Sequence, residues 1–472
     1  MAQSEFTAAD LDAFSGLVGR LRGLPADDPL RLRAERVAES FARDGRRGRR
    51  QDRRVAKTEA DTRIDKATVL GAVDRRMDAP MSDADCGPLG DYSRTHYCYV
   101  CKRPYRRAHA FYHRLCPVCA QDNLARRAAG TDLTGRRVLL TGGRVKIGFQ
   151  LALMLLRDGA ELLVTSRFPQ DAGSRFRAEP DSAGWLDRLT VVGIDLRDPR
   201  QVIGFCDELL VDGRPLDIVI NNAAQTVRRP NEAYALLAAK EHSALVSGAP
   251  GGSGTPGEPR DLGALGAPGD PDGRVPVLLA PGYQPTAMVS PRADFLSGPY
   301  ELDEAGLLPD QAPTNSWSAR LGELDPAELL ETHLVNALAP ALLCDRLLPL
   351  LAASAFPRRY IVNVTAVEGR FKVRNKTPGH PHTNMAKAAL NMLTRTSAAE
   401  LARRGIYMCA VDTGWITDEN PAPKRARLAE AGFRTPLDIV DGAARVYDPI
   451  VRGEAGDPVF GVFLKDYKAA AW

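Results

Sequence analysis

Short apolar runs and amphipathic segments alternate along the C-terminal part of the chain and predict a parallel sheet. Runs of strand character at 138–141, 161–167, 189–195 and 216–224 are separated by segments of helix length, and 149–157 is apolar at helical spacing. Strands that alternate with helices form a parallel sheet with crossover connections. The pattern therefore predicts a doubly wound α/β domain.

Helical spacing also marks the N-terminal region, where it predicts an arm. Apolar residues recur every three or four positions in 10–22 and again in 30–43, and prolines separate the two segments. If the helix continues beyond residue 43, five basic side chains fall on one of its faces: Arg46, Arg50, Arg53, Arg54 and Lys57. Glycine and proline then become frequent. We assign 1–75 to a helical, basic arm and 76–95 to a linker.

The basic face of this arm has two interpretations. The first is a solvated helix that is frayed by Gly45 and Gly48. The second is an electrostatic contact with nucleic acid or with an acidic protein partner. No aromatic residue is interleaved with the basic ones, which argues against stacking on single-stranded bases.

Two pairs of cysteines follow the linker and predict a metal site. Cys98 and Cys101 form one CxxC pair, and Cys116 and Cys119 form a second pair fourteen residues further on. Such pairs place four thiolates tetrahedrally around one zinc ion and leave no open position for catalysis. We therefore expect a structural zinc in a zinc-ribbon-like module at 96–130, and we expect this module to dock rigidly on the neighbouring domain.

The whole-chain composition limits the classes of function. A net charge of +4 is small for 472 residues, so bulk charge does not make the chain a polyanion binder. The sequence shows neither an apolar run that could span a bilayer nor a signal peptide, so we expect no membrane contact. The isolated cysteines Cys206, Cys344 and Cys409 lie in apolar segments, as expected of buried thiols in a cytoplasmic protein. Abundant Ala, Arg and Gly are typical of a GC-rich bacterial genome.

The first strand of the predicted sheet ends in the glycine turn Thr141-Gly142-Gly143-Arg144-Val145-Lys146-Ile147-Gly148. A glycine turn between a strand and a helix presents backbone N–H groups and a helix N-terminus to a phosphate. This turn resembles the TGxxxGxG motif of the short-chain dehydrogenase/reductase (SDR) family, and Asn221-Asn222-Ala223-Ala224 resembles its NNAG motif. The resemblance covers about 131–472 and implies a Rossmann-type fold.

The resemblance also implies a nicotinamide coenzyme and the residues that bind it. They are Thr141, Gly142, Arg144, Lys146, Ile147, Gly148, Ser166, Arg167, Asp195, Leu196, Asn221, Asn222, Ala223, Lys387 and Gly414. Lys146 stands where the family has a glycine, and its ammonium can replace the lost backbone contact as a point charge. The second strand ends in Ser166-Arg167 without the carboxylate that holds the ribose of NAD, and this favours NADP(H), with NAD(H) as the alternative.

The family's catalytic positions are only partly kept. Asn336 and Lys387 match the helix asparagine and the active lysine, whereas Ala366 replaces the serine and Thr383 replaces the tyrosine. A threonine hydroxyl is far less acidic than a phenol, so it cannot take over the same proton transfer. If catalysis survives, Thr365 can hold a substrate carbonyl, and His382 or His380 can supply a proton.

Three functions remain open from the sequence. The first is an atypical SDR-type NADP(H)-dependent oxidoreductase that acts on an unknown carbonyl or alcohol. The second is a catalytically silent NADP(H)-binding regulatory or scaffold protein, and the third is a nucleic-acid-associated protein that uses the arm and the zinc module. A Gly/Pro-rich insertion at about 231–316 is expected to be loop-like, with flanks that form a lid or a partner surface. A packed C-terminus predicts a homodimer interface.

Overall fold

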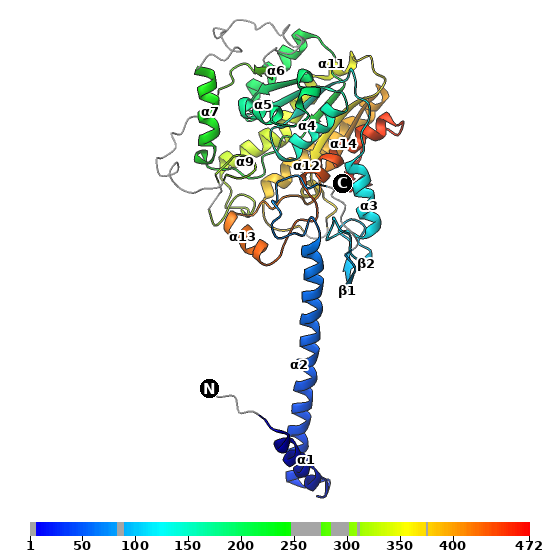
Figure 1. The fold of residues 1–472 in the computed structure, drawn as a ribbon. Coiled ribbons are helices and arrows are strands. Elements are labelled where there is room, and N and C mark those ends of the chain that lie inside the picture. The colour runs from blue at the N-terminus through cyan, green and yellow to red at the C-terminus, as the bar shows by residue number, and fades with distance from the viewer. Residues whose placement is uncertain (1–5, 83–88, 247–274, 285–301, 309–311, 374–375) are drawn as a thin grey trace.

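The computed structural model describes residues 6–82, 89–246, 275–284, 302–308, 312–373 and 376–472. These residues form a large α/β body, a small cysteine module attached to it and a long helical arm that projects from the same side (Figure 1). The Gly/Pro-rich stretches of the expected insertion, 248–259 and 266–273, lie outside the described residues.

The body is built on a sheet of nine strands within the described part of the chain. Their order is β11-β10-β9-β8-β6-β3-β4-β5-β7, and all neighbours pair in parallel except β10 and β11. The strands are β3 (Arg137–Thr141), β4 (Glu161–Ser166), β5 (Leu189–Gly193), β6 (Ile218–Asn221), β7 (Val277–Leu279), β8 (Arg359–Thr365), β9 (Ile406–Asp412), β10 (Phe463–Lys465) and β11 (Lys468–Ala470). The doubly wound α/β fold expected from the sequence is confirmed.

Helices cover both faces of this sheet, because its central strands are apolar on both sides. In β3, Val138 and Leu140 face one hydrophobic core and Leu139 faces the other. The first core is closed by α4 (Lys146–Arg157), α5 (Pro169–Arg177) and α14 (Ile439–Glu454), and the second by α6 (Pro199–Asp212), α10 (Ala339–Arg346) and α12 (Pro381–Arg403). The remaining helices of the described body are α7 (Ala235–Val246), α9 (Pro326–His333), α11 (Leu348–Ala352) and α13 (Ala422–Glu430).

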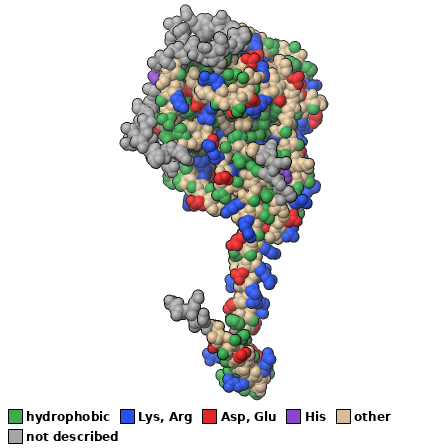
Figure 2. Space-filling model, viewed as in Figure 1, with side chains coloured by type: hydrophobic (Ala, Val, Ile, Leu, Met, Phe, Trp, Pro, Cys, Tyr) green, Lys and Arg blue, Asp and Glu red, His purple; other side chains and the backbone are tan. Residues whose placement is uncertain are grey.

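The arm consists of α1 (Ala8–Arg22), which folds back on α2 (Pro29–Ala67). The structure continues α2 through Gly45 and Gly48 as one helix, where the sequence suggested fraying. The five basic side chains of the predicted face are exposed along the projecting shaft, where Figure 2 shows basic residues: Arg46, Arg50, Arg53, Arg54 and Lys57. None of the described helices combines the length and the apolar character needed to cross a membrane.

The cysteine module comprises β1 (Asp91–Tyr97), the antiparallel β2 (Pro104–Arg107) and α3 (Pro117–Arg127). It shares a hydrophobic core with the body, in which Phe111, Tyr112 and Leu115 pack with Leu437 and Ile439. The module is therefore docked on the body through an apolar interface.

Charged groups reinforce this docking. The Arg127 side chain is 2% exposed and forms ion pairs with Asp438 and Asp441 at the start of α14. Arg445, in the middle of the same helix, donates to the side-chain Oδ1 of Asn123 at 2.8 Å. If the module shifted on the body, the buried charges of Arg127 and its partners would lose one another, and an unpaired buried charge is strongly destabilising. These contacts therefore hold the module in one orientation.

The segment expected to be a linker is not free of the body. β1 already begins at Asp91, inside the expected linker. Asp78 forms an ion pair with Lys146 at 3.1 Å, and the backbone N–H of Met81 donates to Asp438. In its described part before residue 83, the segment is therefore held on the body through Asp78 and Met81.

The described flanks of the insertion are ordered parts of the body. α7 packs on α5, where the Glu241 carboxylate accepts hydrogen bonds from the backbone N–H groups of Gln170 and Asp171. β7 pairs with β5 and forms an edge of the sheet. α7 belongs to a flank of the insertion that was expected to form a lid or a partner surface, and the loop-like character expected for the insertion does not hold for β7.

Candidate functional site

The glycine turn after β3 is tightly packed and ends at the start of α4. Gly142 has a φ of +72°, and a Cβ atom there would lie 2.9 Å from the Ala223 Cα atom. A Cβ atom on Gly148 would lie 2.1 Å from the Gly142 carbonyl oxygen. No side chain caps the N-terminus of α4, so its first backbone N–H groups are free to receive an anion.

This turn opens into a groove of about 460 Å³ along the carboxyl ends of the strands. In a doubly wound sheet this edge is where ligands bind. The predicted coenzyme residues that line the groove are Gly142, Arg144, Lys146, Ile147, Gly148, Ser166, Arg167, Asp195, Leu196, Asn222, Ala223 and Lys387. The flanks of the insertion also reach it through Tyr234, Ala305 and Leu307.

Three predicted cations of the groove differ in their environment. Arg144 is buried and donates to Asp171 at 2.6 Å and to the Ala305 carbonyl at 2.9 Å. The Lys146 ammonium pairs with Asp78, as described above. For Arg167, the described residues provide no carboxylate within 4 Å, and its guanidinium lies over the rings of Phe168 and Tyr234. Arg144 and Lys146 are thus paired with carboxylates, whereas Arg167 can pair with a negatively charged ligand.

Three other predicted coenzyme residues lie outside the lining of this groove. The Thr141 hydroxyl accepts from the backbone N–H groups of Asn222 and Ala223, each at 3.0 Å. Asn221 donates to the Asn363 side chain at 2.8 Å and is buried. Gly414 lines the neighbouring cavity instead. Thr141 therefore holds the groove residues Asn222 and Ala223 in place, and Asn221 is bonded to Asn363 in the interior.

Asn336 lies in a π-helical turn, Leu334–Leu338, between α9 and α10. Its side chain accepts from the Gln225 backbone N–H at 2.7 Å and donates to the Gln225 carbonyl at 2.9 Å. Gln225 in turn lines the groove. Asn336 therefore fixes the chain that follows β6, and it acts on the groove through Gln225.

Lys387 projects from α12 into the groove next to the end of β8. Its ammonium donates to the Val364 carbonyl at 3.0 Å, and the residue is 6% exposed. Burial lowers the pKa of Lys387 to about 8, against the opposing effect of the negative charge of Glu368. Lys387 is thus a desolvated cation at the groove, and such groups mark functional sites.

The other predicted catalytic residues are placed differently from one another. Thr365 lines the groove, and its hydroxyl donates to the Lys387 carbonyl at 3.4 Å. Thr383 and His382 are 3% and 0% exposed, and neither lines the groove or the neighbouring cavity. Burial lowers the pKa of His382, so its imidazole is neutral at neutral pH. The geometry therefore does not place His382 or Thr383 where a substrate would lie.

A larger cavity of about 710 Å³ adjoins the groove. The two spaces share Thr226, Ala366, Thr413, Thr417 and Glu419. Other walls of the cavity are formed by Tyr99, Trp317, Glu368, His380, Asn384 and Trp415. The position of the lost serine, Ala366, thus lies at the junction of the two spaces.

Glu368 is a cavity residue that the sequence analysis missed. It lies in a short turn after β8, and the next residue, Gly369, packs against Lys387: a Cβ atom on Gly369 would lie 2.6 Å from the Lys387 carbonyl carbon. Burial raises the pKa of Glu368, and the nearby charge of Asp412 adds to this. No ion pair to Glu368 forms within the described residues. A carboxyl group that keeps its proton more easily than usual therefore faces the cavity.

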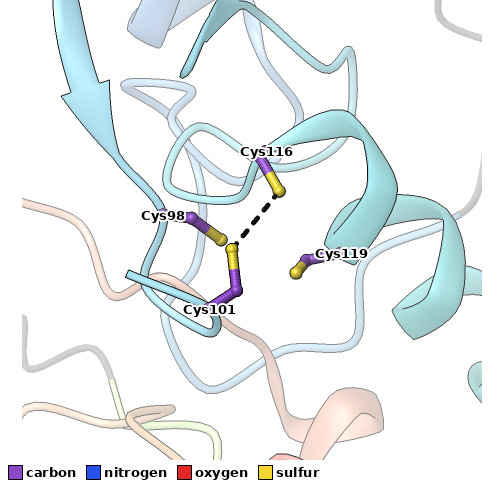
Figure 3. Close-up of side chains that lie close together, drawn as sticks. All are labelled: Cys98, Cys101, Cys116 and Cys119. Atoms are coloured by element: carbon purple, nitrogen blue, oxygen red, sulfur yellow. Dashed lines mark hydrogen bonds between the residues drawn. The ribbon is translucent and has the colours of Figure 1, made fainter. Parts of the chain in front are cut away.

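The four predicted zinc ligands come together at one end of the cysteine module (Figure 3). The sulfur atoms of Cys98, Cys101, Cys116 and Cys119 lie within 4.8 Å of one another, and those of Cys101 and Cys116 are 3.7 Å apart. Tetrahedral zinc with Zn–S bonds of about 2.3 Å separates its sulfur ligands by about 3.8 Å. The residues present therefore fit a four-thiolate metal site.

Comparison with known protein families gives two matches, separated by residues 244–305. Residues 136–243 match the model of the short chain dehydrogenases, and residues 306–437 match that of the enoyl-(acyl carrier protein) reductases. The uncharacterized protein R665 of Acanthamoeba polyphaga mimivirus is 31% identical over 371 residues, which span 75% of this chain and 71% of that protein. A probable oxidoreductase of Streptomyces antibioticus is 38% identical over 92 residues, 20% of this chain and 30% of the relative.

Two solved structures resemble this chain at low sequence identity. The RhlG/NADP active-site complex of Pseudomonas aeruginosa is 18% identical with a TM-score of 0.43, over 71% of this chain and 95% of that one. The carbonyl reductase Sniffer of D. melanogaster is 17% identical with a TM-score of 0.44, over 72% of this chain and 100% of that one.

Proposed function

Since the chain belongs to the short-chain dehydrogenase/reductase superfamily, we propose that it is an atypical NADP(H)-dependent oxidoreductase of a carbonyl or alcohol substrate. The observation that carries this proposal is the position of Lys387, a desolvated cation that lines the groove, which adjoins a cavity large enough for a substrate. Acidic, basic and aromatic side chains share the cavity wall, which favours a polar substrate over a purely apolar one.

The groove fits a nicotinamide dinucleotide in three respects. The uncapped N-terminus of α4 suits a diphosphate, Arg167 offers a cation at the end of β4, and Lys387 stands at the other end of the groove. Bound NADPH would supply the hydride that reduces a carbonyl carbon. The groove residues would bind and orient the coenzyme, and Asn336 would keep the wall at Gln225 in place.

Arg167 is expected to select NADP(H) over NAD(H). Replacing it with glutamate places a carboxylate at the end of β4, which repels a 2′-phosphate and accepts from a ribose hydroxyl. We expect Arg167→Glu to weaken NADPH binding roughly a hundredfold while NADH binding stays equal or improves. Titration calorimetry with both coenzymes measures this change. The matched control is Arg177→Glu on the same face of the sheet, at a position away from the groove; an equal effect of both variants would remove the assigned role of Arg167.

Glu368 is the group best placed to carry the proton that the lost tyrosine would have carried. It lines the cavity next to Gly369, which packs against Lys387, and its raised pKa keeps the carboxyl group protonated at higher pH than in a free glutamate. In the reductive direction, the Glu368 O–H bond breaks as its proton passes to the carbonyl oxygen, while the hydride adds to the carbonyl carbon. The carboxylate that remains takes a proton from water before the next turnover.

This role predicts a specific pH dependence. The rate of carbonyl reduction should fall as the pH rises through the raised pKa of Glu368, because only the protonated carboxyl group can donate. In Glu368→Gln, reduction should slow roughly a hundredfold and this pH dependence should disappear. Coenzyme binding should stay unchanged, since Glu368 does not line the groove. Steady-state rates across pH measure the effect, and a variant with full activity and the same pH profile would exclude Glu368.

The alternative is a catalytically silent NADP(H)-binding protein. It is favoured by Ala366 and Thr383, which cannot hydrogen-bond a carbonyl and cannot replace a phenol. Purified protein incubated with NADPH and a broad panel of aldehydes and ketones distinguishes the two functions. Coenzyme oxidation with any of them supports the enzyme, whereas NADPH binding without consumption supports the silent protein.

A further inference from the structure

The cysteine module contributes one side chain to the substrate cavity, Tyr99. This residue directly follows the predicted metal ligand Cys98 and lines the cavity together with Gly414 and Trp415. Its phenolic oxygen accepts the backbone N–H of Trp415 at 2.9 Å. The contact joins residues 99 and 415, so it exists only because the module is docked on the body.

The position of Tyr99 is determined by the fold around the cysteines. The Tyr99 backbone N–H donates to the Arg114 carbonyl at 2.8 Å, which ties the first CxxC turn to the second one. The Cys98 backbone N–H donates to the Arg103 carbonyl at 3.0 Å. A metal held by all four sulfurs would clamp the same two turns together, because each turn contributes two ligands.

The turn at 413–415, which Tyr99 contacts, lines both the groove and the cavity. Thr413 lines the groove and the cavity, and Gly414 and Trp415 line the cavity. Gly414 has a φ of +84°, and a Cβ atom there would lie 2.6 Å from Leu437 and 3.6 Å from the Tyr99 hydroxyl. The turn is thus closely confined between the body and Tyr99. If the Trp415 backbone N–H loses its acceptor, the turn at 413–415 becomes more mobile at the end of the groove.

We propose that Tyr99 is a positioning residue that couples the cysteine module to the active-site turn at 413–415. Metal in the module fixes Tyr99, Tyr99 fixes Trp415, and the ordered turn completes the end of the coenzyme groove. Coenzyme affinity therefore depends on metal in the module, although no cysteine lines the groove. This inference rests on the proposed coenzyme binding and adds a structural control of it.

The test compares Tyr99→Phe with Tyr105→Phe in the full chain. Tyr105 is the matched control, since its hydroxyl donates to the His113 carbonyl inside the same module and does not line the cavity. NADPH affinity is measured by titration calorimetry and metal content by elemental analysis. Selective ¹⁵N-tryptophan labelling gives one backbone amide signal for each of the four tryptophans, and Trp415→Phe identifies that of Trp415.

We expect Tyr99→Phe to keep its metal and its melting temperature, to shift the Trp415 amide signal upfield, and to bind NADPH about fivefold more weakly. Metal-stripped wild-type protein should show at least the same loss of affinity, and Tyr105→Phe should show none. Equal NADPH affinity and an unchanged Trp415 signal in Tyr99→Phe would overturn the coupling but leave the proposed function intact. If metal-loaded wild-type protein takes up no NADPH, the proposed function and the coupling both fail.

Discussion

The Lys387→Ala variant is expected to reduce NADPH-dependent turnover roughly a hundredfold or more. Lys387 places its ammonium at the junction of the groove and the end of β8, where it donates to Val364 and lines the coenzyme site. Alanine removes both the charge and the donor, and no other described lysine lines the groove at this end. Steady-state kinetics with the best substrate of the carbonyl panel measure the loss.

A second variant separates function from folding at this position. Burial lowers the pKa of Lys387 to about 8, below the 10.5 of an unperturbed lysine, so the folded protein holds this proton less tightly than the unfolded chain. At pH values below about 8 the buried charge therefore costs stability, on the order of 3 kcal/mol, and the cost is removed as the pH rises towards 10.5. Lys387→Met should accordingly melt at a higher temperature than the wild type near neutral pH while being inactive. A folded Lys387→Met variant with wild-type activity would contradict the assigned role, and a variant that melts at a lower temperature than the wild type would contradict the stability prediction.

The Cys116→Ser variant is expected to lose its zinc and to lower the melting temperature by roughly 10 °C or more. The module has two short strands and one helix, and its aliphatic core partners Leu437 and Ile439 come from the body, so metal binding should supply much of its folding free energy. Because this core is continuous with Leu437 and Ile439, its loss also exposes the start of α14.

Elemental analysis and thermal unfolding measure both parts of this prediction. The wild type should contain one zinc per chain. The matched control is Cys206→Ala, which removes a buried cysteine of the body far from the cluster and should keep the metal. Wild-type protein that contains no metal, or a Cys116→Ser variant as stable as the wild type, would exclude a structural zinc site.

The sequence predicts best those motifs whose structure is determined by residues close to one another along the chain. A glycine turn between a strand and a helix has one main structural use, and the structure places Gly142 and Gly148 where a side chain would collide with the backbone. Two CxxC pairs likewise converge, because the spacing within each pair brings its sulfurs to one side of a turn. Lys387 could be placed because several family motifs occur in the same order along the chain.

The features that the sequence missed depend on contacts between distant segments. β7 has three residues within an irregular insertion, so its pairing with β5 leaves no periodic pattern to detect. Tyr99 reaches the cavity only through the docking of the cysteine module. Glu368 is a single acidic residue in a turn, and only its burial beside Lys387 distinguishes it.

His382 is expected from the sequence to donate a proton, but the structure places it away from the site. His382 is one residue from the position of the lost tyrosine, but α12 begins at Pro381, and the first turn of this helix directs His382 and Thr383 into the interior. Their neighbour Asn384 lines the cavity instead. Successive residues on a helix point in different directions, so proximity in sequence did not place them at the site.

We propose above all that the groove along the carboxyl ends of the strands binds a nicotinamide coenzyme, although Lys146 stands where the family has a glycine. Titration calorimetry of the purified full chain with NADPH and with NADH tests it most directly. The account predicts one site per chain, with NADPH bound more tightly than NADH. No heat of binding with either coenzyme, from protein that is folded and contains its metal, would contradict the account and leave only the fold.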